Sequence, residues 1–349
     1  MGQSPSQGLK ERDTSLDLIR IIAFLSVISV HFFLNSGFYD QPVVGNRMYV
    51  MVLLRSFFMN CVPLFMILSG YLLNRKKVSV KYYVGGLKTV FIYVLASIFC
   101  LVYMAQEKPI SIGTGFLMTL DFSAAPYAWY IEMYLGLFLL IPFLNLVYHG
   151  LENKKQKQFL LFIMLSMTAL PLAINIDHQI IPAWWSAIYP LTYYFIGAYL
   201  SEYLPKIKIR YLLVLLCLHV ICMGSFCFIR SYNATFEWGM WCDWGSLSNT
   251  ITAVLVFMIV KKIPTKQWNW RIKTGIKYIS SLCLGAYLLS WIFDTMYYPI
   301  LAEKVPEMIY RLEYMPIMII AVATSALLLS VVVTFIGSQL MKYVRKAVK

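Results

Sequence analysis

The sequence predicts an all-α polytopic membrane protein, and three observations support this fold class. The 349 residues are 60% hydrophobic and only 13% charged, whereas soluble domains carry roughly 25% charged residues. Ten apolar segments come close to the length of about 20 residues that a helix needs to cross a bilayer. Basic residues gather in alternate loops, which is the bias that orients membrane proteins. We therefore expect about ten transmembrane helices.

The predicted transmembrane segments are separated by short loops. None of these loops is long enough to fold as a soluble domain, so residues 1–349 are expected to form a single transmembrane domain without an appended soluble domain. Residues 1–15 are polar and are expected to form a cytoplasmic N-terminus. The ten segments are 16–35, 49–73, 84–105, 127–148, 157–175, 185–203, 209–230, 247–262, 277–299 and 315–341.

The loop charges predict that both termini are cytoplasmic. Of the 30 Lys and Arg residues, 24 fall on one side of the predicted bundle when Arg20 is counted with them. The basic side of a membrane protein faces the cytoplasm, so this bias accounts for the net charge of +14. A basic chain can also indicate nucleic-acid binding, but here the charge follows the topology. We therefore expect membrane lipids as partners and no nucleic acid.

The first apolar segment carries two ionisable side chains, Arg20 and His31, which need a reason to lie inside a membrane. They are eleven residues apart, which is close to three helical turns, so both project from one face. Asp17 precedes Arg20 by three residues and joins the same stripe. A rise of about 1.5 Å per residue separates the guanidinium and the imidazole by roughly 16 Å along the axis. The helix thus places a fixed cation near one surface and a proton-exchanging group towards the other.

Four ionisable residues are expected at one depth of the membrane: His31, Arg55, Glu132 and Asp294. Each falls in the outer third of a different predicted helix, and buried charges must pair or line a cavity. We therefore predict a shared polar pocket that opens outward. His31 is the candidate general base because histidine exchanges protons near neutral pH. Glu132 is the first choice for the carboxylate that orients the imidazole, and Asp294 is the second.

Each of these residues also has a structural interpretation. An intramembrane histidine such as His31 also serves as a hydrogen-bonding residue between helices, and Arg55 with Glu132 also fits a buried ion pair. Arg20 at a helix end fits a side chain that snorkels to the membrane surface. Trp129 and the outer tryptophans fit an interfacial belt or a stacking surface for sugar rings around the segment WGMWCDWG, residues 238–245.

A basic rim follows the second segment and consists of Arg75, Lys76 and Lys77. Such a rim suits the capture of a phosphorylated cytoplasmic donor, and it also fits ordinary snorkelling. The seven cysteines show no zinc-type spacing, so we expect no metal site.

Four segments, taken together and in order, resemble acyltransferase family 3, the bacterial membrane O-acyltransferases that modify cell-envelope carbohydrates. The first contains Asp17, Arg20 and His31, and the resemblance covers essentially the whole chain. The four segments are LDLIRIIAFLSVISVH (16–31), VPLFMILSGYLL (62–73), AWYIEMYLGLFLLIPFLN (128–145) and SLCLGAYLLSWIF (281–293).

The resemblance implies ten transmembrane helices, a cytoplasmic acyl-CoA donor that is usually acetyl-CoA, and an acceptor hydroxyl on a glycan or lipid-linked sugar. It gives His31 the catalytic role and Arg20 a donor-binding role. The chain departs from the family pattern at Met59, where many relatives have arginine, and at Ser290, where relatives often have histidine. A basic pair at the start of the third helix is reduced to Lys88.

These expectations define two sets of candidate residues besides the catalytic His31, Glu132 and Asp294. The expected donor site consists of Arg20, Asp17, Arg75, Lys76 and Lys88. The expected acceptor site consists of Arg55, Trp129 and Ser290.

The sequence therefore favours an integral-membrane O-acyltransferase in a bacterial cytoplasmic membrane. It would move an acyl group, expected to be acetyl, from acyl-CoA to a hydroxyl of a surface or lipid-linked saccharide. A secondary transporter or a polysaccharide flippase is the alternative, but internal repeats and paired broken helices, which mark many transporters, are not visible. A lipid-modifying acyltransferase differs only in its acceptor.

Overall fold

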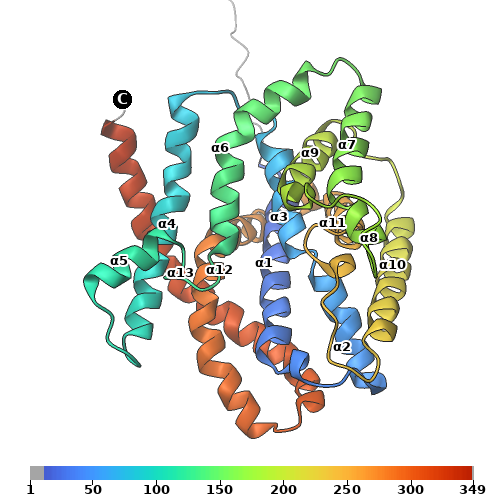
Figure 1. Ribbon diagram of the computed structural model, residues 1–349. Helices are drawn as coiled ribbons and strands as arrows, with labels where there is room; N and C mark the ends of the chain where they lie inside the picture. Colours follow the sequence, from blue (N-terminus) through green and yellow to red (C-terminus); the bar gives the residue numbers. More distant parts are fainter. Residues whose placement is uncertain (1–11, 348–349) are drawn as a thin grey trace, which may run out of the picture.

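A computed structural model describes residues 12–347, and within this range the chain is a bundle of α-helices without a β-strand (Figure 1). Eight segments of the described chain are long and apolar enough to cross a membrane. The predicted all-α polytopic fold is thus confirmed. The helices are α1 (Thr14–Asn35), α2 (Gly45–Phe58), α3 (Cys61–Leu73), α4 (Val80–Met104), α5 (Ile112–Leu120), α6 (Trp129–Gly150), α7 (Lys154–Thr168), α8 (Leu170–Ile174), α9 (Tyr189–Glu202), α10 (Ile209–Arg230), α11 (Leu247–Lys261), α12 (Trp270–Lys304) and α13 (Met315–Ala347).

Two of the ten predicted segments are shorter helices than expected. Residues 157–175 correspond to α7 and α8, which are separated at Ala169. Residues 185–203 contain α9, which has only 14 residues. Pro171 and Pro190 stand in the first turns of α8 and α9. Proline suits a helix start and cannot donate a hydrogen bond to a preceding turn, so each limits how far its helix extends backwards.

The predicted segment 49–73 is two helices rather than one. Pro63 lies in the first turn of α3 and cannot donate a backbone hydrogen bond to the last turn of α2. The side-chain amide of Asn60 instead donates to the carbonyl of Phe57 at the break. Arg55 therefore lies in the last turn of α2, on a different helix from the cavity-lining residues of α3.

The structure also contains a helix that the sequence analysis missed. α5 has nine residues, which is far below the length of about 20 residues that a membrane span needs. Its Ile112, Phe116 and Leu117 are exposed, and Figure 1 shows α5 extending from the side of the bundle beside α4.

Both ends of the described chain lie at the same end of the bundle, where α1 begins and α13 ends (Figure 1). That both termini are cytoplasmic stays a prediction. Of the polar N-terminal stretch 1–15, residues 1–11 lie outside the described part of the chain.

Two polar contacts join α1 and α12 in a matched register. Near the start of α1, the Ser280 hydroxyl donates to Asp17 Oδ1 at 2.7 Å. Near its end, His31 Nδ1 lies 3.6 Å from Asp294 Oδ2. On each helix the two positions are fourteen residues apart, or roughly 21 Å. The two helices therefore run in the same direction, with one polar pair at each end.

α3 and α9 cross each other in close contact. Gly70 and Gly197 form this crossing, because a Cβ at Gly70 would lie 2.0 Å from the carbonyl oxygen of Tyr194. A Cβ at Gly197 would lie 2.0 Å from the carbonyl oxygen of Ile67. Small residues allow membrane helices to approach at backbone contact, so both positions require glycine.

Candidate active site

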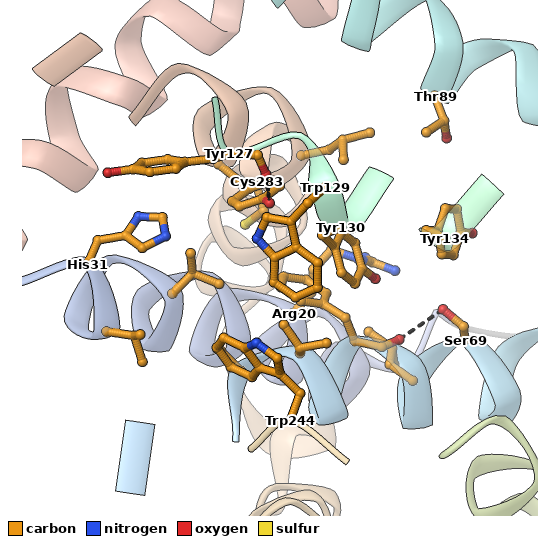
Figure 2. Close-up of a pocket in the computed structure, with 18 of the residues that line it drawn as sticks. Arg20, His31, Ser69, Thr89, Tyr127, Trp129, Tyr130, Tyr134, Trp244 and Cys283 are labelled. Atoms are coloured by element: carbon orange, nitrogen blue, oxygen red, sulfur yellow. Dashed lines mark hydrogen bonds between the residues drawn. The ribbon is translucent and has the colours of Figure 1, made fainter. Parts of the chain in front are cut away.

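A cavity of about 570 Å³ lies beside α1 and is the setting for the candidate site (Figure 2). Both Arg20 and His31 line it, so it follows α1 over roughly the 16 Å that separate them. Figure 2 shows His31 at one side and Ser69 and Thr89 at the other. We call these the His31 end and the Arg20 end. α3, α12, the start of α6 and the loop before α11 supply most of the remaining wall, which is largely apolar.

His31 and Asp294 form the polar centre of the His31 end. The Asp294 side chain is 0% exposed and the His31 side chain 11% exposed, with 3.6 Å between Nδ1 and Oδ2. This is an ion-pair separation rather than a hydrogen bond, and Nδ1 makes no hydrogen bond in the described chain. Because Nδ1 faces Asp294, Nε2 on the opposite edge of the ring is the nitrogen left for a ligand in the cavity.

Tyr127 and Asn35 hold this pair in place. The Tyr127 hydroxyl donates to Asp294 Oδ2 at 2.9 Å, and its ring lies 3.8 Å from the imidazole of His31 between centroids. The Asn35 side-chain amide is close to the Tyr127 hydroxyl at 3.2 Å and donates to the carbonyl of His31 at 2.8 Å. Outer contacts of this kind fix the orientation of a reactive imidazole.

The prediction that Glu132 lies in the same pocket was wrong. Glu132 is exposed, does not line the cavity and makes no ion pair with Arg55 or His31 within residues 12–347. Asp294, the second choice, is the carboxylate that lies beside His31. Glu132 lies in the first turn of α6, where Tyr130 and Ile131 form the buried face of the helix. The depth of Glu132 in the membrane therefore did not determine on which face of α6 its side chain lies.

The two remaining acceptor candidates on α6 and α12 have different surroundings. Trp129 lines the cavity and lies 5.6 Å from Trp244 between ring centroids. Ser290 is completely buried and donates its hydroxyl to the carbonyl of Tyr287 at 2.8 Å within α12. Ser290 is absent from the cavity lining, so the structure does not bring it together with Trp129 at the cavity, and the acceptor contacts of both residues stay predictions.

Arg20 is oriented by two neighbours. Its Nη1 donates to Asp17 Oδ1 at 3.2 Å and to the Ser280 hydroxyl at 2.7 Å. Asp17 is buried and also accepts from Arg12 Nε at 2.7 Å. Asp17 is not part of the cavity lining, so it positions Arg20 instead of reaching a ligand there itself. Nε and Nη2 of Arg20 form no hydrogen bond in the described chain, and its side chain is 29% exposed.

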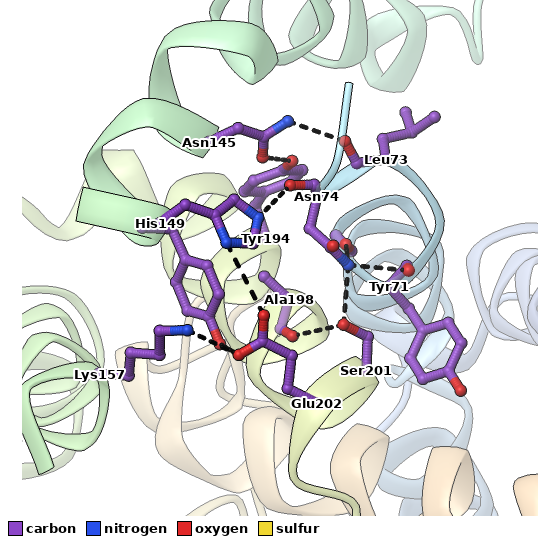
Figure 3. Close-up of polar contacts among 12 residues, drawn as sticks. Tyr71, Leu73, Asn74, Asn145, His149, Lys157, Tyr194, Ala198, Ser201 and Glu202 are labelled. Atoms are coloured by element: carbon purple, nitrogen blue, oxygen red, sulfur yellow. Dashed lines mark hydrogen bonds and ion pairs between the residues drawn. The ribbon is translucent and has the colours of Figure 1, made fainter. Parts of the chain in front are cut away.

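A polar network holds the C-terminal end of α3, where the basic rim begins (Figure 3). Asn145 donates to the carbonyls of Leu73 at 2.9 Å and Lys76 at 2.8 Å, and it accepts from the Tyr194 hydroxyl at 2.6 Å. His149 Nε2 lies 2.7 Å from the carbonyl oxygen of Asn74. Because Leu73 also lines the cavity, the network fixes the cavity wall and the rim together.

The side chains of the rim itself reach outward. Arg75 and Lys76 are exposed and do not line the cavity, nor does the half-buried Lys88. Thr89, the neighbour of Lys88, does line it. These three basic residues therefore lie outside the cavity, and within the described part of the chain Arg20 alone of the Lys and Arg residues lines it.

Arg55 is close to the cavity without lining it. Its Nε donates to the Tyr39 hydroxyl at 2.8 Å, and Cζ lies 4.2 Å from the ring centroid of Trp238. Tyr39 and Trp238 both line the cavity. Arg55 is thus one side chain removed from the His31 end, and the proposed ion pair with Glu132 is absent.

Tyr127 and Asn35 were not among the residues predicted from the sequence. Asn35 follows His31 by four residues, which places it on the same helical face, so this spacing was a usable signal. Tyr127 stands two residues before Trp129 in a loop that the sequence analysis placed in a helix. Its contact with Asp294 joins residues 167 positions apart, and nothing in the local sequence indicates it.

A comparison with protein families identifies the chain. A family model described as an acyltransferase domain matches residues 13–338. The chain belongs to acyltransferase family 3. The match covers nearly the whole chain, so the resemblance carried by the four motifs is confirmed, and the protein is a multi-pass membrane acyltransferase. Comparisons with curated proteins and with solved structures found no match.

We expect Asp294→Asn to lower the rate of this acyltransferase by about 100-fold or more, because the imidazole loses its orienting carboxylate. Glu132→Gln is the matched control and is expected to keep a near-normal rate, since Glu132 is exposed and outside the cavity. Initial rates of acyl transfer, normalised to the amount of folded protein, measure both. Loss of activity in Glu132→Gln with normal activity in Asp294→Asn would reverse the assignment.

Proposed function

We propose that this acyltransferase is an integral-membrane O-acyltransferase of the bacterial cytoplasmic membrane. It transfers an acyl group, acetyl in the first instance, from cytoplasmic acyl-CoA to a hydroxyl of a surface or lipid-linked saccharide. The observation that carries this proposal is one cavity with a cation at one end and a histidine–carboxylate pair at the other. Membership of acyltransferase family 3 supports the reaction class.

The proposed chemistry uses His31 as the general base. The acceptor hydroxyl lies at Nε2, which takes its proton as the oxygen attacks the thioester carbonyl. A carbon–oxygen bond forms, the carbon–sulfur bond breaks, and the proton leaves with the CoA thiol. Asp294 stabilises the positive charge that the imidazole carries between these steps.

The proposed donor site is the Arg20 end of the cavity. Arg20 offers free N–H groups, and guanidinium groups bind phosphate oxygens strongly. Ser69, Thr89 and Tyr134 add hydroxyl groups to this end of the wall. Arg75, Lys76 and Lys88 lie outside the cavity, where they suit the attraction of an anionic donor before it enters.

The proposed acceptor site is the His31 end. Trp129 and Trp244 lie together in the cavity wall, and aromatic rings present the flat apolar surface on which a sugar ring packs. Membrane vesicles that contain the full chain, supplied with labelled acetyl-CoA and the host's envelope glycans, test the transfer. Label in an alkali-labile ester on glycan supports the proposal, and absence of label in every glycan and lipid fraction contradicts it.

We expect Arg20→Ala to weaken donor binding by about 10- to 100-fold, because it removes a charge-assisted phosphate contact. Acetyl-CoA affinity, measured on purified full-length protein in detergent, checks this expectation. Arg210→Ala is the matched control, since Arg210 is exposed and stacks on its neighbour Tyr211 outside the cavity. Unchanged affinity in Arg20→Ala would return Arg20 to a purely structural role beside Asp17.

A further inference from the structure

The guanidinium of Arg55 is buried without an acidic partner. Its side chain is 0% exposed, and Nη1 and Nη2 have no hydrogen-bond partner among residues 12–347. No carboxylate of residues 12–347 forms an ion pair with it. An uncompensated buried charge is strongly unfavourable. A bound anionic ligand would compensate the charge of Arg55.

Aromatic rings compensate the charge only in part. Arg55 Cζ lies 4.2 Å from the ring centroid of Trp238, 4.4 Å from Phe236 and 5.7 Å from Tyr39. Cation–π contacts do not use the N–H groups, which project in the plane of the guanidinium. The thiol of Cys242 is a further neighbour, but sulfur is a weak acceptor. The two terminal nitrogens, which form the bidentate fork for carboxylate or phosphate, therefore have no oxygen acceptor among residues 12–347.

Trp238 separates this guanidinium from the cavity. Its side chain is 45% exposed, and it lines the same cavity as His31 and Tyr39. A half-exposed side chain on a loop is easier to displace than a packed helical one. Rotation of the Trp238 ring would therefore give a group in the cavity access to the terminal nitrogens of Arg55.

We infer that Arg55 is an oxyanion subsite at the His31 end and that Trp238 is its cover. The acceptor saccharide accordingly carries a carboxylate or a phosphate, which Arg55 binds while a hydroxyl of the same molecule lies at His31. The identity of the occupant as acceptor rests on the proposed acyl transfer. The anion subsite itself does not rest on the proposed acyl transfer, because anion binding can be measured without it.

Calorimetric binding to the full-length protein in phosphatidylcholine nanodiscs tests the subsite. The probes are glucuronate, farnesyl diphosphate and neutral glucose. We expect at least one oxyanion to bind the wild-type protein and to bind Arg55→Gln about tenfold more weakly or worse. Arg47→Gln is the matched control on the same helix, because Arg47 is exposed and paired with Glu313 at 2.9 Å, and its affinity should stay within about twofold.

Trp238→Ala provides a second test of the subsite if the Arg55→Gln variant does not fold. Removing the cover leaves the charge in place, so the affinity for the bound oxyanion should rise about fivefold or more. An affinity for oxyanions that is absent in the wild type, or equal in wild type and Arg55→Gln, or not raised in Trp238→Ala, overturns the subsite. Competition by phosphatidylglycerol in the nanodisc would assign it to a lipid headgroup instead of the acceptor.

The outcome is separable from a failure of the proposed function. Glucuronate binding identifies a carboxylate sugar, and farnesyl diphosphate binding identifies a lipid-linked phosphate. If oxyanions bind through Arg55 but no acyl group is transferred to any glycan, the subsite stands and the acyl-transfer proposal fails. If acyl transfer to a neutral glycan proceeds at the same rate in Arg55→Gln as in the wild type, the acyl-transfer proposal stands and the acceptor inference fails.

Discussion

His31→Ala is expected to abolish acyl transfer while the protein still inserts and accumulates at a normal level. Removal of a general base costs about 100- to 10,000-fold in rate, and no other histidine of residues 12–347 lines the cavity. The fold should tolerate the change, because Asp294 keeps its hydrogen bond from Tyr127. Acylated glycan in cells that carry only the variant, together with the amount of protein in the membrane, measures the effect.

His219→Ala serves as the matched control for this experiment. His219 also lies within an apolar helix, but its Nε2 is 3.0 Å from the carbonyl oxygen of Ser248 and it is not part of the cavity. It should retain normal transfer. Wild-type levels of acylated glycan with His31→Ala would remove His31 from the chemistry and leave it as a hydrogen-bonding residue between α1 and α12.

Gly197→Ala is expected to destabilise the fold strongly, because Gly197 lies at the close crossing of α3 and α9. The added Cβ would lie 2.0 Å from the Ile67 carbonyl oxygen and 2.8 Å from the Tyr71 backbone nitrogen. Backbone atoms cannot rotate away, so α3 and α9 must separate, at a cost of about 3 kcal/mol or more. The Tm in detergent and the monodisperse fraction after purification report this loss.

Gly136→Ala provides the comparison for the glycine experiment. Gly136 lies on α6, and a Cβ there meets no atom within 4 Å, so the same change should leave the Tm nearly unchanged or raise it slightly through helix propensity. A Tm for Gly197→Ala equal to that of the wild type would show that α3 and α9 do not cross at backbone contact in the folded protein.

The first helix was the part of the site that sequence could predict best. Asp17, Arg20 and His31 share a face because their spacing follows the helical period, and the structure places Arg20 and His31 in one cavity wall. Membrane thickness and the rise per residue then give each ionisable residue a depth. From these two quantities Asp294 was predicted at the depth of His31, although it belongs to a helix more than 240 residues later.

The depth of a residue in the membrane does not determine on which face of its helix the side chain lies. Glu132 and Asp294 were both expected at the level of His31, but a residue meets a cavity only when its face of the helix is packed there. α6 begins at Trp129, and its first turn buries Tyr130 and Ile131 while Glu132 stays exposed. One hydropathy value per segment carries no information about this rotation.

Loops and helix breaks position the other residues of the site, and the sequence did not predict these positions. Tyr127 reaches Asp294 from the short stretch before α6, which hydropathy alone assigned to a span. The break between α2 and α3 places Arg55 behind Tyr39 and Trp238 rather than beside Glu132. Such contacts between distant residues follow from tertiary packing, which overrides local pattern.

We propose that one cavity brings the donor from the Arg20 end to His31. A structure of the full-length protein with a non-reactive thioether analogue of acetyl-CoA tests this claim most directly. We expect the CoA phosphates at Arg20 and the acyl carbonyl at His31, with the base about 3–4 Å from the position of an attacking oxygen. An analogue bound wholly outside the cavity, or bound with its acyl group at Arg20, would rule out this path for the donor.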